Sequence, residues 1–133
     1  MAEFTLYTQE NASAEAKPLL ADPVAAFGML PNLHAVMAEA PTLLKGYQVL
    51  HELFQNTSFN AEERTVVWQT INVEHECHYC VPAHSAIAAS MNVDQDIVDA
   101  LVNKTPLADA KLETLRETTL AMTRDRGVIS DEQ

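Results

Sequence analysis

The repetition of helical patterns along most of the chain limits its possible folds more than any other feature. Apolar residues recur at spacings of three and four from Leu43 to Phe54 and again from Val66 to Ile71, the period of one helix face. Valine is the only abundant strand former, it falls mostly inside these patterns, and the chain has only 3 Gly. We therefore predict an all-α fold, a compact helical bundle with helices over about 22–29, 33–40, 41–55, 61–73, 78–91, 95–103 and 106–126.

Prolines and capping residues mark the ends of these helices. Pro23 and Pro41 fit the first turn, where a missing backbone N–H costs nothing. Pro82 is tolerated only near a helix start, which places that start at residues 78–81. The sequence also predicts N-caps at Asn32, Asn60 and Asp94 and a C-cap at Gly127.

The length of 133 residues is typical of one domain, so we expect a single domain over residues 1–133. Residues 1–20 are polar and lack a sustained period, which predicts a loosely ordered segment. The sequence predicts a polar tail over residues 128–133. Within it, residues 130–133 have the Ser-x-x-Gln form of a capping box, so a truncated chain and a frayed end are both open interpretations.

The formal net charge is -11. A surface this acidic repels nucleic-acid phosphates and anionic lipid headgroups, so we expect no nucleic-acid partner and no membrane association. The first residues lack the basic and apolar regions of a secretory signal, and no apolar run approaches the roughly 20 residues of a membrane span. These features predict a cytoplasmic protein.

The only two cysteines, Cys77 and Cys80, are separated by two residues. A disulfide that closes so short a loop stabilises a fold very little in the chain-entropy model. In a reducing compartment such a pair is more often redox-active or metal-binding than structural. The spacing itself lets one sulfur attack and the other resolve.

His84 is a third candidate catalytic residue beside this pair. It follows Cys80 by four residues, so both side chains share one face of the predicted helix. A thiol at a helix N-terminus is favoured as thiolate, and His84 could accept the Cys80 proton. The alternative is structural, with two buried cysteines and a histidine that belongs to the core.

Zinc is the other alternative for this segment. Cys77, Cys80, His84 and either His75 or His78 could supply four ligands. Structural zinc sites usually draw two ligands from each of two separate segments, and the chain has no second Cys/His pair. We therefore predict no metal site.

Residues 76–84, ECHYCVPAH, resemble the signature of the AhpD-like alkylhydroperoxidases in the carboxymuconolactone decarboxylase superfamily. Residues 27–32 and 61–64 are similar to upstream parts of that family, and the likeness extends over about residues 20–127. The resemblance implies an all-α bundle that assembles as homotrimers or homohexamers. It also implies reduction of a hydroperoxide, with an external dithiol on a lipoyl-bearing protein as reductant and no bound cofactor.

The same resemblance assigns roles to the site residues. Cys80 would attack the peroxide, Cys77 would resolve the sulfenic acid to a disulfide, and His84 would belong to a proton relay. Tyr79 stands where the best-known members have a second relay histidine, and it is a poor base with a reference pKa of about 10. Thr65 stands at the relay glutamate position. Glu62 and Glu63 are candidate substitutes, but we expect Glu74, one turn before Cys77, to take this role.

We therefore predict a thiol–disulfide peroxidase whose catalytic residues are Cys80, Cys77, His84, Glu74 and Tyr79. The alternatives are a redox sensor or interaction protein without turnover, a zinc-stabilised helical module and an enzyme like the lactone decarboxylases. The decarboxylase alternative leaves the cysteine pair unexplained.

Overall fold

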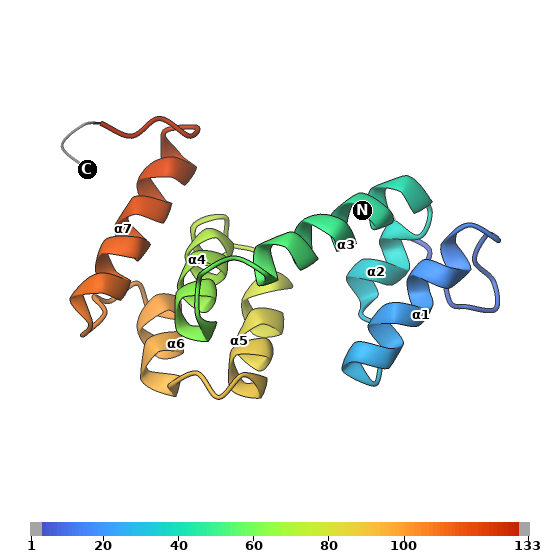
Figure 1. The fold of residues 1–133 in the computed structure, drawn as a ribbon, viewed down its shortest axis with the longest axis horizontal. Helices are drawn as coiled ribbons and strands as arrows, with labels where there is room; N and C mark the ends of the chain where they lie inside the picture. Colours follow the sequence, from blue (N-terminus) through green and yellow to red (C-terminus); the bar gives the residue numbers. More distant parts are fainter. Residues whose placement is uncertain (1–3, 131–133) are drawn as a thin grey trace. The chain divides into compact units, whose positions relative to one another are not determined.

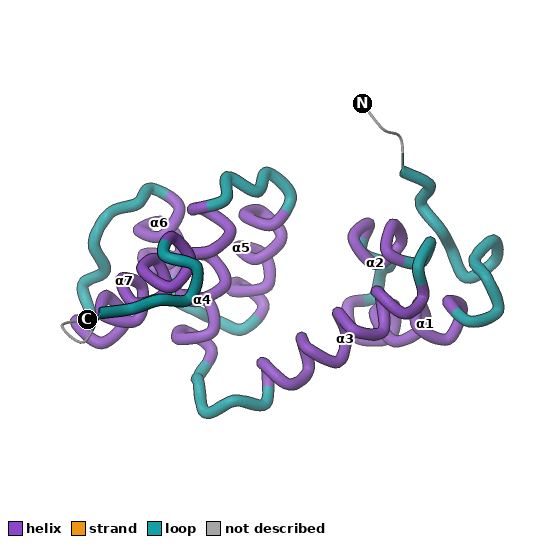
Figure 2. The backbone as a smooth tube through the Cα atoms, turned by 90° about the horizontal axis from the view of Figure 1, so that it is seen from above, coloured by secondary structure: helices purple, strands orange, loops and turns teal. Residues whose placement is uncertain are grey.

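The structure, a computed structural model, describes residues 4–130, and these form seven helices and no strand (Figures 1 and 2). The predicted all-α class is confirmed for this part of the chain. The helices are α1 (Ala16–Phe27), α2 (Asn32–Met37), α3 (Pro41–Gln55), α4 (Ala61–Glu74), α5 (Cys80–Ser90), α6 (Gln95–Val102) and α7 (Ala110–Arg124).

The chain divides into two compact units, residues 1–57 and 58–133. The first unit contains α1, α2 and α3, which pack against one another around a small aliphatic core. The prediction of a loosely ordered segment over residues 1–20 is wrong for residues 16–20, which belong to α1. Ala12, Ala16 and Leu20 repeat every four residues and are buried in this core.

Helix α1 therefore begins at Ala16, before the predicted start at Pro23, and Pro23 lies inside it. Proline has no N–H for the carbonyl four residues earlier, which is that of Leu19. The Gln48 side chain from α3 donates to this carbonyl at 2.7 Å. A tertiary hydrogen bond thus replaces the missing helical one, which sequence rules cannot anticipate.

In the second unit α4 is the central helix and packs against α5, α6 and α7 (Figure 1). The predicted cap at Asn60 is confirmed, since its side chain accepts the Glu63 N–H at 2.9 Å. The Asn60 N–H in turn donates to the Glu63 carboxylate at 2.8 Å, which completes a capping box. Because neighbours surround α4, its buried residues include the polar Thr65, Gln69 and Thr70 as well as Val66.

Most other predicted boundaries agree within a few residues. Pro41 opens α3, and the Asp94 side chain caps α6 by accepting the Asp96 N–H. Helix α7 begins later than predicted because Asp109 is its N-cap. In the loop before it, the N–H of buried Leu107 donates to the carboxylate of Glu113 in the first turn of α7.

Two further boundaries differ slightly. Asn32 is the first residue of α2 rather than its cap, and α2 ends at Met37 rather than near residue 40. Helix α7 ends at Arg124 with Asp125 as its C-cap, so the predicted C-cap at Gly127 is wrong. Gly127, two residues later, adopts a left-handed φ of 85° and donates its N–H to the Met122 carbonyl at 2.7 Å.

The capping-box pattern of residues 130–133 lies mainly outside the described residues. Among the helices of residues 4–130, none combines the length and apolar character that a membrane crossing requires.

Candidate functional site: the Cys77–Cys80 turn and its surroundings

The two cysteines lie on the turn that joins α4 to α5. Glu76 reverses the chain there with a left-handed φ of 51°. The Cys77 N–H then donates to the Asn72 carbonyl at 3.0 Å, and the Val81 N–H donates to the Cys77 carbonyl at 3.0 Å. The segment is thus fixed to the end of one helix and the start of the next.

Cys77 and Cys80 form a disulfide, with their Cα atoms 5.2 Å apart. Cys80 is the first residue of α5, as the position of Pro82 predicts. Its backbone N–H donates to the Cys77 sulfur at 3.1 Å. This contact ties the Cys77 sulfur to the first turn of α5.

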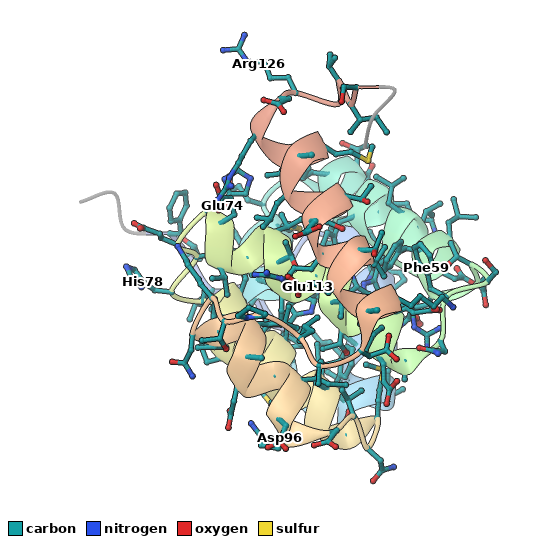
Figure 3. The ribbon with its side chains drawn as sticks, turned by 90° about the vertical axis from the view of Figure 1, so that its left-hand side faces the viewer. Phe59, Glu74, His78, Asp96, Glu113 and Arg126 are labelled. Atoms are coloured by element: carbon teal, nitrogen blue, oxygen red, sulfur yellow. A yellow bond between two sulfur atoms is a disulfide. The ribbon has the colours of Figure 1, made fainter. Side chains whose placement is uncertain are left out.

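A shallow pocket of about 220 Å³ lies beside Cys77. Its wall is largely apolar, with Glu76 and the exposed His78 as polar members; His78 projects outward in Figure 3. Cys80 is not part of this wall, so an incoming molecule in this pocket meets Cys77. The lining residues are Val73, Glu76, Cys77, His78, Val81, Pro82 and Val102.

A buried hydrogen-bond network between α4 and α5 supports the cysteine turn. The Gln69 amide is fully buried and donates to the Val81 carbonyl at 3.1 Å and to the Ser85 hydroxyl at 2.9 Å. Its oxygen accepts the Asn72 side-chain amide at 3.0 Å. Gln69 therefore links α4 to the first turns of α5, next to the disulfide. The sequence analysis missed Gln69 because no local pattern indicates that a glutamine inside a helix is buried.

His84 lies on α5 one turn after Cys80, as the spacing predicts. Its ring packs against Trp68 of α4, with ring centroids 5.0 Å apart and a tilt of 55°. The side chain is half-buried. The indole therefore limits the orientations that the imidazole can adopt.

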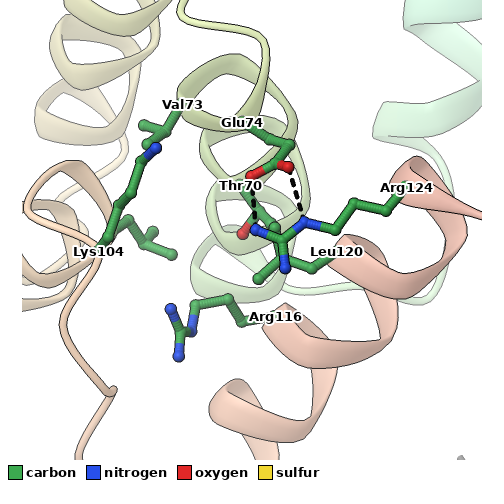
Figure 4. Close-up of a pocket in the computed structure, with 8 residues that line it drawn as sticks. Thr70, Val73, Glu74, Lys104, Arg116, Leu120 and Arg124 are labelled. Atoms are coloured by element: carbon green, nitrogen blue, oxygen red, sulfur yellow. Dashed lines mark hydrogen bonds and ion pairs between the residues drawn. The ribbon is translucent and has the colours of Figure 1, made fainter.

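Glu74 is the last residue of α4, and its carboxylate accepts two hydrogen bonds from Arg124 of α7, at 2.7 and 2.9 Å (Figure 4). These bonds hold the pKa of Glu74 below its usual value. Glu74 lines a different pocket from Cys77. This pairing favours a role in fixing α4 to α7, and a role for Glu74 in proton transfer stays a prediction.

Tyr79 and Thr65 are the two positions where the sequence departs from the pattern of the family that it resembles. Tyr79 is the N-cap residue of α5, and its side chain is exposed. Thr65 is buried, and its hydroxyl donates to the Ala61 carbonyl at 2.8 Å. Thr65 is thus occupied within its own helix.

Within residues 4–130 no group of three or more histidine, cysteine, aspartate or glutamate side chains is arranged to hold a metal ion. The zinc alternative therefore gains no support from the geometry. No protein-family model matches the chain, and no curated protein matches its sequence.

Proposed function

We propose that this protein is an AhpD-like thiol–disulfide oxidoreductase that reduces hydroperoxides through Cys80 and Cys77. The observation that carries the proposal is the bonded cysteine pair at the start of α5. Such a pair can store two electrons and release them without a bound cofactor.

The oxidative half of the cycle uses both sulfurs. The Cys80 thiolate attacks the terminal oxygen of the hydroperoxide, the O–O bond breaks, and the alkoxide leaves as an alcohol after taking one proton. The Cys77 thiol then attacks the sulfenic acid on Cys80 and forms the disulfide, with loss of water. The peroxide gains two electrons, and the two sulfurs lose them.

The reductive half begins at Cys77. A thiolate of an external dithiol enters the pocket beside Cys77, attacks its sulfur and displaces the Cys80 thiolate. The second thiol of the donor then attacks the mixed disulfide and releases Cys77. A lipoyl-bearing protein is the donor that the family resemblance suggests, and a homotrimer or homohexamer is the assembly that it suggests.

His84 is proposed as the base that takes the Cys80 proton. Replacing His84 by glutamine is expected to slow alkylation of Cys80 at neutral pH by roughly tenfold, because only the thiolate reacts. The measurement is the iodoacetamide rate in a Cys77→Ser background. His75→Gln, on the exposed histidine after α4, is the matched control and should change the rate less than about twofold.

The packing of His84 against Trp68 provides the competing explanation. A lower melting temperature with an unchanged Cys80 alkylation rate would assign His84 to packing and remove it from the catalytic residues.

The proposed function is tested by turnover. Micromolar protein with a small dithiol should consume many equivalents of hydrogen peroxide or an organic hydroperoxide. Oxidation that stops after one equivalent, with the dithiol still present, would instead identify a redox sensor.

A further inference from the structure

A second pocket in the unit of residues 58–133 lies among α4, α6 and α7 (Figure 4). Its volume is about 170 Å³. Three of the chain's eight lysines and arginines line it, although the chain as a whole carries a net charge of -11. The lining residues are Thr70, Val73, Glu74, Leu101, Lys104, Arg116, Leu120 and Arg124.

The charges that line this pocket do not cancel. Glu74 pairs with Arg124, and Glu113 pairs with Arg116. Lys104 has no carboxylate within ion-pair distance among residues 4–130, and it acts on Glu74 only at longer range. Three cations and one carboxylate, Glu74, line the pocket, so the lining itself is positively charged.

Thr70 supplies an uncharged donor at the same place. It is only 4% exposed, and its hydroxyl has no hydrogen-bond partner within the described part of the chain. Other helical hydroxyls of this unit, such as those of Thr65 and Thr119, donate to the carbonyl four residues earlier. Thr70 instead lines the pocket from α4, as Arg124 does from α7 (Figure 4).

A buried hydroxyl without a partner is costly to a fold and rare in native proteins. Because Thr70 shares its pocket with three cations, an anionic oxygen is the partner that the lining favours. Charge-assisted hydrogen bonds to such an oxygen are stronger than neutral ones.

We propose that this pocket binds the carboxylate of a small organic acid, with Thr70 donating a hydrogen bond and Lys104 providing the balancing charge. Arg116 and Arg124 keep their carboxylate partners and border the ligand. The small volume favours a monoanionic carboxylate over a phosphate dianion, as does the presence of one lining cation, Lys104, without an ion-pair partner among residues 4–130. Binding here does not depend on the redox state of the cysteines, although Val73 lines both this pocket and the Cys77 pocket.

The experiment titrates the oxidised full-length protein with sodium butyrate at low ionic strength and follows amide chemical shifts. Thr70→Val should weaken butyrate binding by roughly fivefold or more, because one charge-assisted hydrogen bond is lost, while Thr70→Ser should retain it. Thr70→Val should also melt at or above the wild-type temperature, since it removes a buried hydroxyl without a partner.

Lys104→Gln should weaken binding by about tenfold. Lys45→Gln is the matched control, because it makes the same charge change on an exposed α3 residue outside the lining, and it should stay within about twofold. Equal binding by Thr70→Val and wild type, or equal losses in the two lysine variants, would overturn the proposal. Tighter binding of inorganic phosphate or butyramide than of butyrate would overturn the carboxylate assignment.

Discussion

Replacement of Cys77 by serine is expected to reduce peroxide turnover with a dithiol by at least about a hundredfold, because the disulfide that the dithiol reduces cannot form. The Cys80 thiolate should still react once with peroxide, since His84 and the start of α5 are unchanged. Sulfenic acid should therefore accumulate on Cys80. The measurements are steady-state peroxide consumption and trapping of the sulfenic acid with dimedone.

Cys80→Ser is the matched variant. It should lose both turnover and dimedone labelling, while Cys77 should still form a mixed disulfide with a small disulfide reagent through its own pocket. Dimedone labelling of Cys77 in Cys80→Ser, with none on Cys80 in Cys77→Ser, would reverse the assignment of the attacking sulfur.

Replacement of Gln69 by leucine is expected to lower the free energy of unfolding by about 2–3 kcal/mol, a fall in melting temperature of roughly 5–15 °C. The change removes three hydrogen bonds inside a buried network and leaves the Asn72 amide without its partner. Thermal melts of the reduced proteins measure the effect. Hydrogen exchange at the Val81 and Cys77 amides should also become faster.

Gln95→Leu is the control, because Gln95 is an exposed glutamine whose side chain, among the described residues, bonds only to Asp99 on its own helix. Its effect should stay within about 0.5 kcal/mol. If Gln69→Leu and Gln95→Leu have the same melting temperature, the Gln69 network does not hold the cysteine turn in place.

Local signals explain why much of the fold could be predicted. Asn60 with Glu63, Asp94, and Pro41 each act within their own helix, so the pattern alone places those helix starts. Helix α1 could not be placed this way. Its interior Pro23 is compensated by Gln48 from another helix, and its buried alanines carry almost no hydrophobic signal.

The same distinction applies to the candidate site. Cys77, Cys80 and His84 lie within two turns of chain, so their spacing predicts their grouping. Gln69 and Thr70 are buried because α4 is covered by other helices on several sides. Polar residues are normally expected at the surface, so the sequence did not predict their burial. The partner of Glu74 lies fifty residues away, at Arg124, and no local pattern indicates it.

The most direct measurement of the central claim is the reaction of the reduced protein with one equivalent of hydrogen peroxide, followed by alkylation and mass spectrometry. The account predicts that both alkylatable thiols disappear together and that one peptide containing Cys77 and Cys80 loses two hydrogens. Protein that keeps two alkylatable thiols after the peroxide has been added would contradict it.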